Sequence, residues 1–168
     1  AASRTHESLF ERMAGHDGER WVIRDAPPAL FHVLGANTLF TAEETEELKG
    51  PRGGNMLDGM WSDYLKTMSH DRRELLAHFS VQDIVFKVVG VGSVGTRCTA
   101  VLLVDPMSKP LFMQIKEARP SVVARYFKAP PARHQGERVV QGQRMLQAAS
   151  DIFLGWATSP LGRHYYFR

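Results

Sequence analysis

The pattern of apolar and polar positions changes at residue 81. Before it, an apolar stripe at helical spacing predicts a helix over residues 70–79, and the acidic segment that starts at Thr41 has the form of a capping box. The first part, residues 1–80, is therefore predicted to be a mostly helical segment. The expected elements are helices at 3–14, 41–48, 55–68 and 70–79, a strand at 20–25 that Pro27 and Pro28 end, and a flexible break at 50–54.

After residue 81 the apolar runs are β-branched, which is typical of strands. We expect strands at 84–91, 97–104, 111–118 and 164–168, a turn at 105–110, a short helix with a loop after 118, and a helix at 136–150. The predicted fold class is α+β. Residues 81–168 would form an antiparallel sheet with a glycine-loop hairpin and one packed helix, as in the N-terminal lobe of a protein kinase.

Charge divides the chain in the same place. Residues 1–84 carry nine Lys and Arg against fourteen Asp and Glu, whereas residues 85–168 carry twelve against four. The basic half indicates an anionic ligand or partner, or else it docks on the acidic half. Its basic residues are spread out and no zinc spacing or aromatic-rich nucleic-acid motif accompanies them, so we do not expect nucleic acid as a partner.

Apolar run length, the N-terminal residues and the single cysteine each bear on the cellular compartment of the protein. No apolar run approaches the roughly 18–20 residues that a membrane span needs, and residues 1–10 lack the apolar core of a signal peptide. The one cysteine, Cys98, has no partner for a disulfide and lies in a strand-like run, so it is expected to be a small buried side chain. A cytoplasmic protein without a membrane partner is the natural interpretation.

Gly90, Gly92 and Gly95 form the spacing Gly-x-Gly-x-x-Gly, which several unrelated folds use to wrap a phosphate group. A dinucleotide-binding fold would place a helix after the third glycine, and a P-loop would place Lys-Ser or Lys-Thr there. A β-branched run follows instead, so both remain weaker alternatives. A nucleophile elbow is rejected, because Val91 stands where the glycine before Ser93 is needed.

The fourth possibility is strand, glycine loop, strand, as in protein kinases, where the hairpin tip covers the nucleotide phosphates. That arrangement needs a lysine on the next strand, and Lys116 lies there. Alternation places Lys116 and Gln114 on one side of this strand and the apolar Met113 and Ile115 on the other. It also needs a carboxylate on a following helix, and Glu137 begins such a helix. Three separated features therefore occur in the order that a kinase-like phosphate site requires.

A structural interpretation of the same residues stays open. The glycines can form a plain tight turn, and Lys116 can pair with the neighbouring Glu117 or face solvent. Glu137 can be a helix-terminal charge that the helix dipole stabilises. The partner of the lysine is also open, because Gln141 lies one helical turn beyond Glu137 on the same side.

Three segments resemble a known family: "VVGVGSVGTRC", "LFMQIKEA" and "GERVVQGQRMLQAASDIFLGW". They are similar to the twenty-two fifty-two family of bacterial domains of unknown function, and the likeness runs from about Arg24 to Arg168. The resemblance implies a kinase-like protein, distantly similar to aminoglycoside and choline phosphotransferases. Two positions depart from the kinase pattern: Gln114 replaces the small residue that roofs the adenine, and Arg97 replaces a valine.

The resemblance also implies that this chain is an internal fragment. Kinase-like phosphotransferases carry a catalytic aspartate and a metal-binding asparagine in Gly-Asp-x-His-x-x-Asn, and this sequence has no such motif. The chain is then expected to be inactive alone, to need the missing remainder of its own domain, and to leave the Mg ligands outside itself. No catalytic or metal-binding residue is assigned within it.

The expected function is thus the ATP-binding portion of a kinase-like phosphotransferase. Backbone N–H groups of the glycine loop would bind phosphates, Lys116 would orient them, Glu137 or Gln141 would hold the lysine, and Gln114 would lie beside the base. ATP and Mg would be the cofactors, and the acceptor is an unknown small molecule. The alternative is a non-catalytic interaction or pseudoenzyme module. The predicted loop residues are Gly90, Gly92, Ser93 and Gly95.

Overall fold

One antiparallel sheet of six strands organises the chain. The computed structural model describes residues 10–18, 20–32, 51–88, 90, 95–126 and 131–168, with the backbone alone for 51–57. Every neighbouring pair of strands in the sheet is antiparallel. In spatial order the strands are β3 (Leu30–His32), β4 (Ser80–Lys87), β5 (Cys98–Val104), β6 (Pro110–Glu117), β8 (His164–Phe167) and β7 (Gly155–Thr158).

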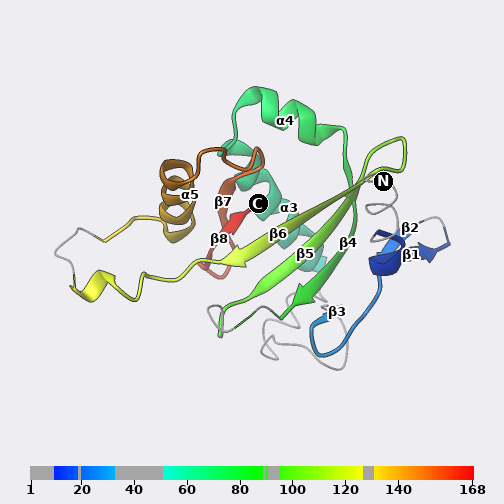
Figure 1. Cartoon of the computed structure of the whole chain (residues 1–168), viewed down its shortest axis with the longest axis horizontal. Coiled ribbons are helices and arrows are strands. Elements are labelled where there is room, and N and C mark those ends of the chain that lie inside the picture. Colours follow the sequence, from blue (N-terminus) through cyan, green and yellow to red (C-terminus); the bar gives the residue numbers. More distant parts are fainter. Residues whose placement is uncertain (1–9, 19, 33–50, 89, 91–94, 127–130) are drawn as a thin grey trace.

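The other elements surround this sheet. A separate hairpin pairs β1 (Ala14–Asp17) with β2 (Arg20–Ile23) and lies beside β4, whereas α5 (Gln135–Leu146) lies at the far side, beside β7 and β8 (Figure 1). Helix α3 (Pro51–Lys66) runs behind the strands in that view, and α4 (His70–Ala77) leads from it into β4. A single turn of 3-10 helix, η2 (Ala124–Tyr126), follows β6.

The face of the sheet that packs on α3, here called the helix face, is apolar where the helix covers it. The ring of Tyr64 on α3 stacks on Phe167 of β8 with centroids 4.1 Å apart, and its hydroxyl donates to the Phe153 carbonyl at 2.8 Å. Gly155 begins β7 at the point of closest approach, where an added Cβ would lie 2.6 Å from the Tyr64 ring. The buried core here comprises Met60, Tyr64, Met68, Leu76, Val101, Leu103, Met113, Ile115, Phe153, Ala157 and Phe167.

The opposite face, here called the hairpin face, is only partly covered. Alternation along β5 sends Ala100, Leu102 and Val104 to this side, where Ala14 and Ile23 of the β1–β2 hairpin pack on them. The hairpin contacts β4 and β5, and α5 contacts β7 and β8. The part of this face that lies between them is therefore where polar side chains of the sheet remain.

The structure confirms the α+β class with antiparallel sheets and most of the strands expected from the sequence. The strands expected at 20–25, 97–104, 111–118 and 164–168 correspond to β2, β5, β6 and β8. The strand expected at 84–91 begins earlier, at Ser80, and ends at Lys87. The helix expected at 41–48 lies outside the described residues. Of that expected at 3–14, residues 10–14 are described: 10–13 are helix, and Ala14 already begins β1.

Several local predictions are wrong. Residues 51–54 are not a break but the start of α3, because proline fits the first helical position, where its missing N–H is not needed. Helix α5 ends at Leu146 rather than at residue 150. Strands β1, β3 and β7 were not expected. The division at residues 80 and 81 stays a prediction, and β3 from the first part hydrogen bonds to β4 of the second.

The close contact at β7 predicts a specific stability difference. Gly155→Ala forces a Cβ against the Tyr64 ring and the Thr67 hydroxyl, so we expect the free energy of unfolding to fall by about 2 kcal/mol. Gly142→Ala is the matched control, because it lies inside α5 with nothing within 4 Å of an added Cβ. It should stabilise the protein by about 0.5–1 kcal/mol. Urea unfolding of both variants checks this, and equal midpoints would contradict the packing.

Candidate functional site

A row of opposed side chains crosses the hairpin face at the end of the long strands. Cys98 on β5 lies opposite Lys116 on β6, and Lys116 lies opposite Tyr166 on β8. Residues opposed in antiparallel strands project to the same face. Lys87, the last residue of β4, alternates in step with the buried Val85 and joins the same row.

Positive charge converges on this row. Cys98 is 2% exposed, as expected for a small buried side chain, and burial raises the pKa of its thiol. The charges of Lys116, Lys87 and Arg168 oppose that rise, so three cations lie around one buried sulfur. Among the described residues, no carboxylate lies within 4.0 Å of the ammonium of either lysine. The row therefore carries a surplus of positive charge that suits an anion.

Among the described residues, no ion pair joins the acidic half of the chain to the basic half. Between described residues, the ion pairs stay within one half of the chain: those of Asp25, Asp63, Asp71, Glu74 and Asp83 within residues 1–84, and those of Glu117 within residues 85–168. Both explanations for the charge division, an anionic ligand or partner and docking of the two halves, therefore stay predictions.

The glycine segment leads directly into this row. It connects the end of β4 at Lys87 to the start of β5 at Cys98, and these strands pair in antiparallel fashion. A strand thus follows the third glycine, which overturns the dinucleotide-fold and P-loop alternatives, since both need a helix there. Gly90 is exposed, and Gly95 is exposed with φ +77°, a conformation that favours glycine. Gly92 and Ser93 lie outside the described residues.

Helix α5 lies beside the end of the row that Tyr166 of β8 forms. His134 caps the helix, because its Nδ1 accepts from the Glu137 backbone N–H at 3.1 Å. Its Nε2 lies 3.0 Å from the Thr158 hydroxyl on β7, and its ring stacks on His164 at 4.0 Å. Thr158 and His164 alternate in step with Tyr166. The N-terminus of α5 is therefore on the same face as Lys116.

The predicted ion pair of the lysine is nevertheless not formed. The N-terminus of α5 lies on the face of Lys116, but no ion pair joins Lys116 to Glu137, and Gln141 is exposed. The first turn of α5 is held against the backbone of β8 instead, where an added Cβ on Gly136 would overlap the Tyr165 carbonyl oxygen. That contact fixes the helix without help from the lysine.

The sequence interpretation missed the carboxylate that the structure buries. Glu117 projects to the side opposite Lys116, is 5% exposed, and holds the guanidinium groups of Arg97, Arg119 and Arg163 at 3.1–3.6 Å. Burial alone would raise its pKa, but the hydrogen bonds from Arg119 and the Arg97 backbone outweigh it and the pKa is lowered. The alternative that Lys116 pairs with Glu117 is therefore wrong, because adjacent strand residues face opposite ways.

Comparison with known proteins identifies a family. A model of the family described as "Uncharacterized protein conserved in bacteria (DUF2252)" matches residues 1–168. The chain belongs to this family. No curated protein and no solved structure matches it. No helix in the described part of this family member is long and apolar enough to cross a membrane. Within the same residues, no three His, Cys, Asp or Glu side chains are grouped to hold a metal ion.

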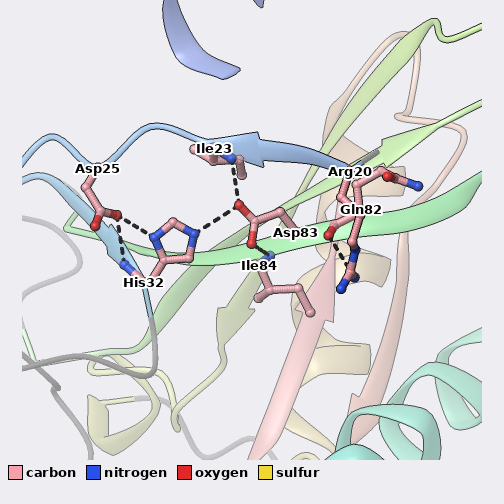
Figure 2. Close-up of polar contacts among 7 residues, drawn as sticks. All are labelled: Arg20, Ile23, Asp25, His32, Gln82, Asp83 and Ile84. Atoms are coloured by element: carbon pink, nitrogen blue, oxygen red, sulfur yellow. Dashed lines mark hydrogen bonds and ion pairs between the residues drawn. The ribbon is translucent and has the colours of Figure 1, made fainter. Parts of the chain in front are cut away.

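A second polar cluster, here called the histidine clasp, joins β3 to β4 and the hairpin (Figure 2). His32 Nδ1 lies 2.7 Å from Asp25, and its Nε2 lies 3.1 Å from Asp83. Asp83 also accepts from the backbone N–H groups of Ile23 at 2.6 Å and Ile84 at 2.8 Å. With a carboxylate at each ring nitrogen, His32 links the segment before β3 to β4, and Asp83 links β4 to the hairpin.

The clasp favours protonated histidine, because only the imidazolium donates from both nitrogens. Burial alone would lower the pKa of His32, but the Asp25 hydrogen bond and the charge of Asp83 outweigh it and raise the pKa. The stabilisation is therefore fully present below the unfolded pKa of about 6.5 and is lost as pH rises through the folded pKa.

We expect His32→Gln to lose about 1 kcal/mol of stability at pH 6 and much less at pH 9, the value being discounted because His32 is one-third exposed. Chemical unfolding at both pH values measures the difference. His70→Gln is the control, since His70 is largely exposed on α4 and makes only a 3.8 Å contact with Glu74. A loss for His32→Gln that does not change with pH would contradict the protonated clasp.

The cap of α5 predicts the opposite dependence. Burial and the neighbouring His164 lower the pKa of His134, so its contribution is fully present above the unfolded pKa of about 6.5 and is lost as pH falls. Hydrogen exchange of the first-turn amides of α5 should therefore accelerate between pH 6.5 and pH 5, after correction for intrinsic rates. His134→Asn, which caps without titrating, should remove this acceleration. The same acceleration in both proteins would refute the role of His134.

Proposed function

We propose that the chain is the nucleotide-binding portion of a kinase-like phosphotransferase, with ATP and Mg as cofactors. One observation carries this proposal: Lys116 and Lys87, neither with a carboxylate partner among the described residues, lie on one face of the sheet together with Arg168, and Lys87 ends the strand that leads into the glycine segment. Glycine N–H groups and lysines at the end of a sheet are what a polyphosphate needs. The kinase-like relationship itself rests on the resemblance of the sequence.

In the proposed reaction, an acceptor hydroxyl attacks the terminal phosphorus of ATP, the bond from that phosphorus to the bridging oxygen breaks, and ADP leaves. This chain would bind and orient the phosphates through Gly90, Gly95 and Lys116. Mg would arrive with ATP, and its ligands and the base that takes the hydroxyl proton would come from outside the chain. The chain alone would then bind the nucleotide without transferring phosphate. The contribution would be positioning and charge neutralisation.

A non-catalytic interaction or pseudoenzyme module is the second candidate. The observation that favours it is the missing contact between Lys116 and Glu137, since an active kinase-like site would join them. In that case the same cationic row would contact an anionic partner protein. The acceptor in the first candidate, a small-molecule hydroxyl, follows from the resemblance only.

Titration of the full chain with Mg-ATP, followed by amide NMR shifts, tests the proposal. We expect shifts at residues 88–97 and 114–116, and about ten-fold or more loss of affinity in Lys116→Ala, because a charge-assisted phosphate contact is removed. Lys109→Ala is the control, since Lys109 is an exposed lysine just before β6, at the other end of the strand. A folded chain that shows no shifts, or equal affinity in both variants, would contradict nucleotide binding at this face.

A further inference from the structure

Gln114 is held in one orientation by Arg168. The two residues exchange both backbone hydrogen bonds, at 2.7 and 3.0 Å, so their side chains project to the same face. Nε and Nη2 of Arg168 both donate to the Gln114 Oε1, each at 3.2 Å. A guanidinium has donors only, so the amide oxygen must face it and the amide nitrogen must point elsewhere.

This contact removes the acceptor capacity of Gln114. An amide oxygen has two lone pairs, and here two N–H groups of Arg168 occupy them. What Gln114 still offers is its NH₂ group, two residues before Lys116 on the same face. Lys116, Lys87 and the remaining N–H groups of Arg168 are also donors only. Burial raises the pKa of Tyr166, so its phenol keeps its proton and can donate, although its oxygen can also accept.

A surface on which donors predominate discriminates between parts of a nucleotide. Phosphate oxygens are acceptors and match every one of these groups. A base edge carries both donors and acceptors, and an exocyclic amine needs an acceptor that Gln114 no longer has. Gln114 occupies the position where a kinase-like site would place the base, two residues before the lysine.

We propose that Gln114, oriented by Arg168, is a phosphate-side donor, and that this face recognises the polyphosphate group and not the base. The ligand class is then a nucleoside triphosphate of any base, or inorganic tripolyphosphate. The inference rests on the proposed function and names which part of the ligand the site binds. Gln114 and Lys116 bind the same chain of phosphates, and Arg168 orients the Gln114 amide and adds positive charge beside it.

The test compares tripolyphosphate, ATP, GTP and adenosine on the full chain, each with the same excess of Mg, by calorimetric titration. Tripolyphosphate, ATP and GTP should bind within about three-fold of one another, and adenosine should not bind measurably. ATP binding that depends on Lys116 but exceeds tripolyphosphate or GTP binding by ten-fold would overturn the inference and leave the proposed function standing. Absence of binding by every ligand would overturn both.

Variants separate the role of Gln114 from general charge. Gln114→Glu replaces the free NH₂ with a carboxylate oxygen, so tripolyphosphate affinity should fall about ten-fold or more through repulsion and the lost donor. Gln147→Glu, exposed at the end of α5, adds the same charge elsewhere and should change affinity by less than about two-fold. Arg168→Met frees the amide to rotate and should weaken tripolyphosphate as well. Equal affinities in Gln114→Glu and Gln147→Glu would refute the phosphate contact.

Discussion

The packing of Met113 and Ile115 of β6 against the helix face is the constraint from which the rest of the site follows. Both side chains are buried in the core built around α3, so the strand cannot rotate or slip by one residue without exposing them. Alternation then sends Gln114 and Lys116 to the hairpin face. The apolar side of one strand thereby decides where the charged side chains point, although it never touches them.

Electrostatic contacts fix the same strand at its end. Glu117 is the first residue after Lys116 and lies on the helix face, where guanidinium groups and the Arg97 backbone N–H surround its carboxylate. A buried carboxylate without partners would be strongly destabilising, so this cluster holds the end of β6 in register with the start of β5. Glu117, and not Lys116, therefore makes the ion pairs that hold the end of β6.

The sequence predicts those parts of the fold that are specified locally. Strands β5 and β6 are seven and eight residues long and carry their own β-branched or alternating pattern, and the face of Lys116 follows from that pattern alone. Strands of three or four residues carry little pattern of their own. The β-branched or aromatic residues of β2 and β8 were enough to predict those two, whereas β1, β3 and β7 were missed. The sequence could not decide whether Lys116 pairs with Glu137, because the position of α5 depends on contacts that Gly136 and His134 make with β7 and β8.

The sheet has two edge strands, and each is held by a histidine with the opposite protonation preference. His32 anchors β3 as an imidazolium, and His134 anchors α5 to β7 as a neutral ring. Near neutral pH the two histidines shift the unfolding equilibrium in opposite directions, so their contributions to its pH dependence partly cancel. The order in which the two edges of the sheet open does depend on pH. In acid the β7 edge separates first, and in base the β3 edge does.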